Sequence, residues 1–159
     1  MIEIHSPLTS YIIFAAKFDI MNIVFHAHSG LRWLVLAGVV VILLKSIVGL
    51  ISNGSYGKFD KILGSATVGL MDMQLLLGLV LYFGYSPYTK NLTFNMGNAE
   101  ERFWSVEHLL LMLLAIVAAH VGKVISKKSQ DASVQFKYQT IFFGISLLLM
   151  IAGIPWSRI

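Results

Sequence analysis

The chain alternates between long apolar runs and short polar interruptions. A bilayer core of about 30 Å takes roughly 20 helical residues to cross, and four apolar runs are long enough to do so. They cover about residues 23–51, 59–85, 103–125 and 136–156. The intervening stretches SNGSYG, SPYTKNLTFNMGN and SKKSQDAS are rich in residues that break helices. The pattern predicts an all-α protein with four membrane-spanning helices in one domain.

Composition supports lipid as the surrounding medium. The 159 residues are 57% hydrophobic and only 13% charged, and the mean hydropathy is +0.76. A soluble domain of this size cannot bury so many apolar side chains. The chain has no cysteine, which excludes disulfides, thiolate zinc sites, cysteine-ligated iron–sulfur clusters and covalent c-type haem.

The formal net charge is +4. The basic residues that cause it gather near the connections between the apolar runs, so membrane topology explains the charge without a nucleic acid partner. Basic residues in short cytoplasmic loops set the orientation of a membrane protein. Seven lie near the first and third connections: Lys45, Lys58, Lys61, Lys123, Lys127, Lys128 and Lys137. Five lie on the other side: Lys17, Arg32, Lys90, Arg102 and Arg158. The bias predicts an up-down-up-down bundle in the inner (cytoplasmic) membrane, with both termini on the periplasmic side.

Residues 1–20 precede the predicted membrane domain, residues 21–159. Their apolar stretch is too short for a span, and no clear small-residue cleavage site follows it. Two interpretations stay open for this leader. Either Met21 is the true start of the protein, or the leader forms an interfacial helix.

The motif HAHSGLRW opens the first apolar run. Each helical residue turns by about 100°, which places His26 and His28 on nearly opposite faces. Polar residues in membranes gather on the protein side, so His28 is predicted to face inward and His26 to lie at the outer interface. Trp33 is expected to anchor the interface, and Gly30 to allow close approach of a neighbouring helix. The face of His28 continues through Arg32, Val35, Val39, Ile42 and Ser46.

The third run carries His108 on a face of mostly small residues, which permits close packing or leaves room for a flat ligand. That face holds Ser105, Met112, Ala115, Ala119, Gly122 and Ser126. His28 and His108 both lie one to two turns from the outer end, roughly 6–8 Å deep. Two imidazoles at equal depth on different helices can ligate one haem iron from opposite sides. The alternative is that each histidine only hydrogen-bonds a neighbouring helix.

Two further ionisable residues fall within the apolar runs. His120 is rotated by about 120° from His108 and is expected to be an interface residue near the cytoplasmic headgroups. Asp72 lies near the middle of the second run, on a face with Ser65, Gly69 and Leu76. An isolated carboxylate in hydrocarbon is costly. Asp72 is therefore interpreted either as a proton-relay group or as the partner of a distant histidine or a neighbouring hydroxyl.

Two charged residues lie close to the proposed ligands in sequence. Arg32 can pair with a haem propionate through charge-assisted hydrogen bonds, or it can anchor at the interface by snorkelling. Glu107 either orients a ligand imidazole or faces water.

The motifs HAHSGLRW, QLLLGLVLYF, RFWSVEHLLLM and IAGIPW carry a family resemblance. Residues 21–159 resemble the short four-helix membrane proteins called "cytochrome B" in Bacteroidota, which are distantly similar to cytochrome b561-type bundles. The resemblance implies membrane electron transfer, exchange of electrons with quinol or quinone, and other redox membrane subunits as partners. Cytochrome b561-type proteins typically ligate two haems with four histidines. Here the inner ligand pair is missing, so the resemblance supports at most one haem b, at the outer side.

Two other functions compete with electron transfer. A cofactor-free membrane subunit of a larger complex would use its histidines and Asp72 only to fasten helices together. A proton-coupled transporter using Asp72 is the weaker alternative, because four spans are few and the sequence has no inverted repeat.

Overall fold

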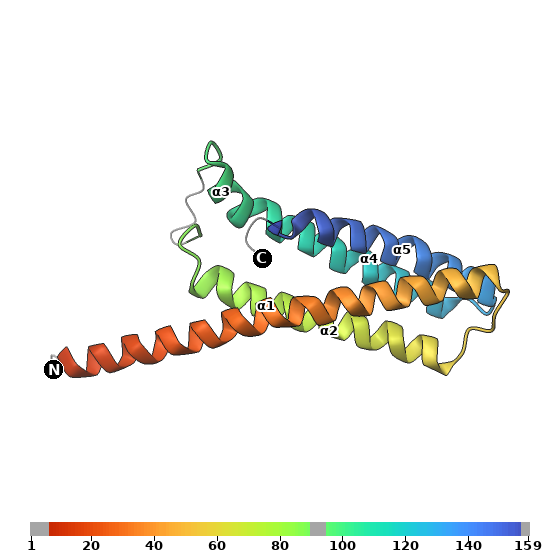
Figure 1. The fold of residues 1–159 in the computed structure, drawn as a ribbon, viewed down its shortest axis with the longest axis horizontal. Coiled ribbons are helices and arrows are strands. Elements are labelled where there is room, and N and C mark those ends of the chain that lie inside the picture. Colours follow the sequence, from red (N-terminus) through yellow and green to blue (C-terminus); the bar gives the residue numbers. More distant parts are fainter. Residues whose placement is uncertain (1–6, 90–94, 157–159) are drawn as a thin grey trace.

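The structure, a computed structural model, describes residues 7–89 and 95–156, and most of these lie in helices (Figure 1). Lys90 and Arg158 lie outside the described residues. The elements are α1 (Pro7–Ile51), α2 (Lys58–Gly84), α3 (Ala99–Arg102), the π-helical turn η1 (Phe103–Glu107), α4 (His108–Lys128) and α5 (Ala132–Gly153). Four stretches are long and apolar enough to cross a membrane: Ala15–Ile51, Lys58–Gly84, Ala99–Lys128 and Ala132–Gly153. The predicted helical class and the four spans are confirmed.

Helix α1 is much longer than a membrane span requires. Its 45 residues extend over about 67 Å at 1.5 Å per residue, and its N-terminal part projects beyond the other helices (Figure 1). The helix begins at Pro7, well before the predicted boundary at residue 23. Proline suits the first position of a helix, and no further proline interrupts the chain before Ile51. Residues 7–20 therefore belong to the same helix as the first span, which begins at Ala15, and both interpretations of the leader stay predictions.

The other spans differ from their predicted limits mainly at the ends. The third begins at Ala99, because the Asn98 side chain caps α3 by accepting hydrogen bonds from the amides of Glu100 and Glu101. In the same way Asp131 caps the start of α5. This last helix ends at Gly153 because the residue before Pro155 adopts an extended conformation.

The four long helices pack in the cyclic order α1, α2, α4, α5. Helix α1 packs along α2 and α5, α4 packs along α5, and α2 makes a smaller contact with α4. Helices α1 and α4 therefore stand diagonally across the bundle. The predicted inward faces of α1 and α4 are confirmed, because they supply much of the core. The buried core residues are Val35, Val39, Ile42, Val68, Met71, Ala115, Ala119, Phe143 and Met150.

The bundle has two ends that differ in their connections (Figure 1). We call one the Tyr56 end; it carries the connection 52–57 between α1 and α2 and the connection 129–131 between α4 and α5. We call the other the His28 end; it carries the end of α2 at Gly84, the turn η1 and the end of α5 at Gly153.

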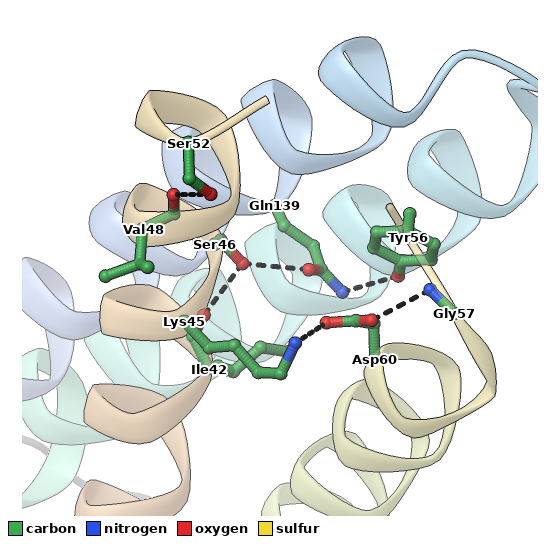
Figure 2. Close-up of polar contacts among 9 residues, drawn as sticks. All are labelled: Ile42, Lys45, Ser46, Val48, Ser52, Tyr56, Gly57, Asp60 and Gln139. Carbon is green, nitrogen blue, oxygen red and sulfur yellow. Dashed lines mark hydrogen bonds and ion pairs between the residues drawn. The ribbon is translucent and has the colours of Figure 1, made fainter. Parts of the chain in front are cut away.

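A polar cluster holds the Tyr56 end together, and Figure 2 shows its members. Lys45 of α1 forms an ion pair with the buried carboxylate of Asp60 in α2. The second carboxylate oxygen of Asp60 accepts a hydrogen bond of 2.9 Å from the Gly57 amide, just before α2. One buried acid thus ties α1 to α2 and fixes the start of α2.

The same cluster reaches α5 through Gln139 (Figure 2). Its side-chain oxygen lies 2.8 Å from the Ser46 hydroxyl of α1, and its side-chain amide donates a 2.7 Å hydrogen bond to the Tyr56 hydroxyl. Burial, with a contribution from the Asp60 charge, raises the pKa of Tyr56 to about 12. The phenol is therefore neutral at physiological pH. The cluster joins three of the four long helices, α1, α2 and α5.

Candidate functional site

A π-helical turn lies directly before His108 at the His28 end. The turn η1 spans Phe103–Glu107, and single π turns inside helices occur frequently at functional sites. Tyr82 of α2 donates a 2.8 Å hydrogen bond from its hydroxyl to the Ser105 carbonyl. The widened turn is thus held by the neighbouring helix. Hydrophobic periodicity treats this segment as a regular helix and gave no signal for it.

His108 has a fixed tautomer because of where α5 ends. Its Nδ1 lies 2.7 Å from the Gly153 carbonyl oxygen, which is one of the carbonyls left without a partner at the end of a helix. A carbonyl only accepts, so Nδ1 carries the proton and Nε2 retains a free lone pair. The rings of Phe103 and Trp104 lie 6.0 and 5.6 Å from the imidazole. Histidines that ligate metals commonly donate their other ring N–H to a backbone carbonyl in this way.

His28 lies against α2. The Gln74 side-chain amide donates a 2.9 Å hydrogen bond to the His28 carbonyl. A Cβ atom built on Gly78 would lie only 3.1 Å from His28 Cε1, so the glycine leaves the space that the imidazole occupies. The Nδ1 atom of His28 is buried and has no hydrogen-bond partner.

Unsatisfied polar atoms concentrate around His28. Within the described part of the chain, four buried side-chain atoms lack a hydrogen-bond partner: His28 Nδ1, Arg32 Nε, Gln74 Oε1 and Thr140 Oγ1. The first three belong to residues next to one another on α1 and α2. A buried unsatisfied group costs about 1–3 kcal/mol, so three in one place require an explanation.

His108 stands on the diagonal helix α4, within electrostatic range of His28 and Arg32, and the hydrogen bond of its ring goes to α5. The Arg32 guanidinium lies 5.0 Å over the Trp33 ring. We call His28, Arg32, Gln74 and His108 the His28 cluster. It combines two imidazoles and one cation from diagonal helices with one amide from α2.

The opposite face of α1 is exposed. His26 lies there as predicted and makes an edge contact with the Phe25 ring. Trp33 is 47% exposed, in agreement with an outward position. The expected role of Gly30 was wrong, because a Cβ atom built there would meet nothing within 4 Å. Gly30 shares the outward face of His26, so no helix approaches it in the protomer.

Glu107 pairs with an arginine and not with a histidine. Its carboxylate accepts a 2.6 Å hydrogen bond from Arg102 Nε, and both side chains are partly exposed. A π turn brings residues five apart into register, which is the spacing of this pair. The Glu107 carboxylate is 43% exposed at the edge of the bundle, which agrees with the alternative that it faces water, and the ion pair with Arg102 is an addition to it.

Asp72 and His120 form a second polar site, away from the His28 cluster. Asp72 Oδ1 lies 2.8 Å from His120 Nε2, between α2 and α4. Of the two interpretations of Asp72, the structure supports partnership with a distant histidine. The structure gives His120 a partner that the sequence analysis had not assigned to it, and its position near the cytoplasmic headgroups stays a prediction. The periodicity of a single helix does not reveal which other helix it packs against, so the sequence did not connect these two residues.

Within residues 7–89 and 95–156, no three histidine, cysteine, aspartate or glutamate side chains come together to hold a bare metal ion. In comparisons with known proteins, no family model, curated protein or solved structure matched the chain. The His28 cluster offers two imidazole nitrogens and one guanidinium from side chains that are each partly buried.

Proposed function

We propose that the protein is a membrane electron-transfer protein that binds one b-type haem at the His28 end. The observation that carries this proposal is the His28 cluster, where three buried polar atoms lack partners and His108 keeps Nε2 free. A buried group of this kind gains most from a ligand that supplies the missing interactions.

The residues of the cluster fit the needs of a haem. The porphyrin supplies four ligands to the iron, so the protein has to supply only the axial ones. His28 and His108 would hold the iron, and the Arg32 guanidinium would pair with a propionate. The bound haem would supply one-electron oxidation and reduction of its iron, while burial and axial ligands of this chain set its potential.

Gln74 would have a positioning role toward His28. Its amide nitrogen already binds the His28 carbonyl, and its Oε1 is an acceptor without a donor. The Nδ1–H of His28 is a donor without an acceptor when Nε2 is used for ligation. We propose that Gln74 Oε1 accepts this hydrogen bond and fixes the orientation of the imidazole, as outer-shell partners of metal-ligating histidines do.

The proposed setting is the inner membrane, with an up-down-up-down course and both termini in the periplasm. The four apolar helices and the basic residues near residues 52–58 and 126–135 support this orientation. It places the haem near the periplasmic face, where quinol or another redox membrane subunit would exchange electrons with it.

Two other functions have an observation in their favour. In a cofactor-free membrane subunit, the hydrogen bond from His108 to the Gly153 carbonyl would serve only to fasten α4 to α5. A proton-coupled transporter would use the Asp72–His120 pair. Neither function accounts for the unsatisfied atoms of the His28 cluster, which is why we favour the haem.

Absorption spectra of histidine variants test the proposal. The reduced wild-type protein should give a sharp low-spin b-type spectrum, and His28→Ala or His108→Ala should abolish it or convert it to a high-spin form. His26→Ala and His120→Ala are the matched controls, and both should keep the wild-type spectrum. Loss of the spectrum in the His26 variant alone, or its persistence in both ligand variants, would contradict the assignment.

A further inference from the structure

One ridge of helix α2 contacts both of the segments that carry the imidazoles of the His28 cluster. Gln74, Gly78 and Tyr82 follow one another at intervals of four residues, and side chains at this spacing form a continuous ridge along a helix. Gln74 donates a hydrogen bond to the His28 carbonyl, and Gly78 leaves the space for the His28 ring. The third residue of the ridge, Tyr82, contacts the turn η1 that precedes His108.

Tyr82 is held through its backbone and through its side chain. Its carbonyl accepts a hydrogen bond from the hydroxyl of Thr89, a buried residue in the chain that follows α2. Its own hydroxyl donates the 2.8 Å hydrogen bond to the carbonyl of Ser105, which is also buried. Water therefore has little access to this carbonyl and does not easily replace the phenol as its donor.

The turn that Tyr82 contacts ends on His108. The amide of His108 donates a hydrogen bond to the Phe103 carbonyl, five residues earlier, and this spacing defines a π turn. The turn brings the rings of Phe103 and Trp104 against the imidazole. If the turn relaxed to a regular α-helix, the residues before it would rotate by about 100° relative to His108, and both rings would leave their places.

Packing alone gives little control over this part of the bundle. Helix α2 makes a smaller contact with α4 than with α1, so few apolar side chains fix the position of the third span relative to α2. A hydrogen bond, in contrast, is favourable only within narrow limits of distance and angle. The bond from Tyr82 to Ser105 therefore defines where η1 lies along α2.

We propose that Tyr82 is a positioning residue for His108. It holds the π turn η1, and the turn holds the imidazole where Nδ1 reaches the Gly153 carbonyl. Gln74 acts on His28 from the same ridge, so α2 sets the relative position of two imidazoles that stand on diagonal helices. This inference rests on the proposed function, because a ligand shared by the two imidazoles is what makes their relative position matter.

Hydrogen exchange in the haem-free protein tests whether Tyr82 holds the turn. Tyr82→Phe removes only the hydroxyl, and the protein would be produced in cells that cannot make haem. Amides in peptides covering residues 103–110 should exchange about two- to tenfold faster than in wild type, as expected for the loss of one hydrogen bond. Tyr56→Phe is the matched control, because it removes a hydroxyl that binds Gln139 at the other end of the bundle. It should leave these peptides unchanged.

The tautomer of His108 tests whether the turn positions the imidazole. Nitrogen NMR of the haem-free, histidine-labelled protein reports the protonated ring nitrogen, and the His108 signals are those absent from His108→Gln. The population with the proton on Nδ1 should fall in Tyr82→Phe and stay at the wild-type level in Tyr56→Phe. Unchanged exchange and tautomer in Tyr82→Phe, or equal changes in the two variants, would overturn the proposal.

Haem release separates positioning from general support of the fold. Transfer of haem to apomyoglobin should be about two- to tenfold faster from Tyr82→Phe than from wild type. Transfer from Tyr56→Phe should match wild type, although this variant also loses a hydrogen bond between helices. Faster exchange of the turn with unchanged haem release would mean that Tyr82 only supports the fold, and would overturn its positioning role. A wild-type protein that binds no haem would refute the proposed function instead, and the tautomer of His108 would still decide the role of Tyr82.

Discussion

The two ends of the bundle are built from similar polar side chains but differ in how these are satisfied. At the Tyr56 end, Lys45 and Asp60 pair with each other, and Gln139 bridges Ser46 and Tyr56. At the His28 end, His28 Nδ1, Arg32 Nε and Gln74 Oε1 are buried without partners. Both groups lie between packed helices, so burial alone does not explain the difference.

The contrast suggests a division of labour along the bundle. Satisfied buried polar groups stabilise one arrangement of the helices, and the Tyr56 end has this character. Unsatisfied ones cost about 1–3 kcal/mol each and are retained where a ligand completes them. The Tyr56 end thus has a structural character, and the contrast supports our proposal that the His28 end binds a ligand. Substitutions at the two ends should have different consequences.

The largest expected effect is the all-or-none labelling of single-cysteine variants, which shows on which side of the membrane each end lies. In intact cells, a membrane-impermeant maleimide should label Asn95→Cys, beyond the His28 end, and should leave Ser55→Cys, at the Tyr56 end, unlabelled until the cells are lysed. The reason is the excess of lysines near the Tyr56-end connections. The reverse pattern of labelling would contradict the orientation.

The next effect concerns stability at the Tyr56 end. Asp60→Ala should lower the free energy of unfolding by about 2–3 kcal/mol, because it leaves Lys45 and the Gly57 amide without their partner. Unfolding in mixed micelles with increasing denaturing detergent measures this. Ser52→Ala is the control at the same end, where the exposed hydroxyl binds only the Val48 carbonyl (Figure 2), and it should cost much less. Equal losses in the two variants would argue against the structural role of Asp60.

A smaller change in stability, of opposite sign, is expected when the positive charge of Arg32 is removed at the His28 end. Arg32→Met should leave the stability of the haem-free protein unchanged or raise it by up to about 1 kcal/mol, because it removes a partly buried guanidinium whose Nε has no hydrogen-bond partner. The same variant should retain haem about tenfold less well in a competition assay with apomyoglobin, since a charge-assisted hydrogen bond contributes about 1.5–3 kcal/mol. A marked loss of stability without haem would mean that Arg32 is already satisfied in the empty site.

The smallest effect compares two helical glycines. Replacing glycine by alanine inside a helix typically stabilises it by about 0.5–1 kcal/mol, and Gly30→Ala should gain this amount because its surroundings are open. Gly78→Ala should gain nothing, since its new methyl group would press on the His28 ring. The free energies of unfolding of the two variants, measured with denaturing detergent, should therefore differ by about 1 kcal/mol. Identical stabilities would show that His28 does not lie against α2.

The parts of the fold that depend on one helix at a time could be predicted from the sequence. The inward face of α1 was deduced from the 3.6-residue period, and Val35, Val39, Ile42 and Ser46 are indeed buried. The opposite exposure of His26 followed from the same geometry. Periodicity is reliable here because burial of a stripe on a helix is a local property of the sequence.

The parts that depend on neighbouring helices could not be predicted. The pairing of Asp72 with His120, and the position of Gln139 between Ser46 and Tyr56, require knowledge of which helices pack together. The π turn before His108 widens the helix by about one residue. None of the residues in FWSVE is typical of a π turn, so nothing in the sequence indicated it. Gly30 was misjudged for a related reason, since glycine is compatible both with close packing and with an open surface.

Haem content measured on the purified protein tests the central claim most directly. The protein would be produced in haem-replete cells, purified in mild detergent, and assayed for haem b by pyridine haemochrome against a protein concentration from amino-acid analysis. The account predicts one haem b per chain, lost in the His28→Ala and His108→Ala variants and kept in His26→Ala. A purified wild-type protein without haem would contradict it and favour the cofactor-free subunit, and two haems per chain would show that ligands beyond the His28 cluster had been missed.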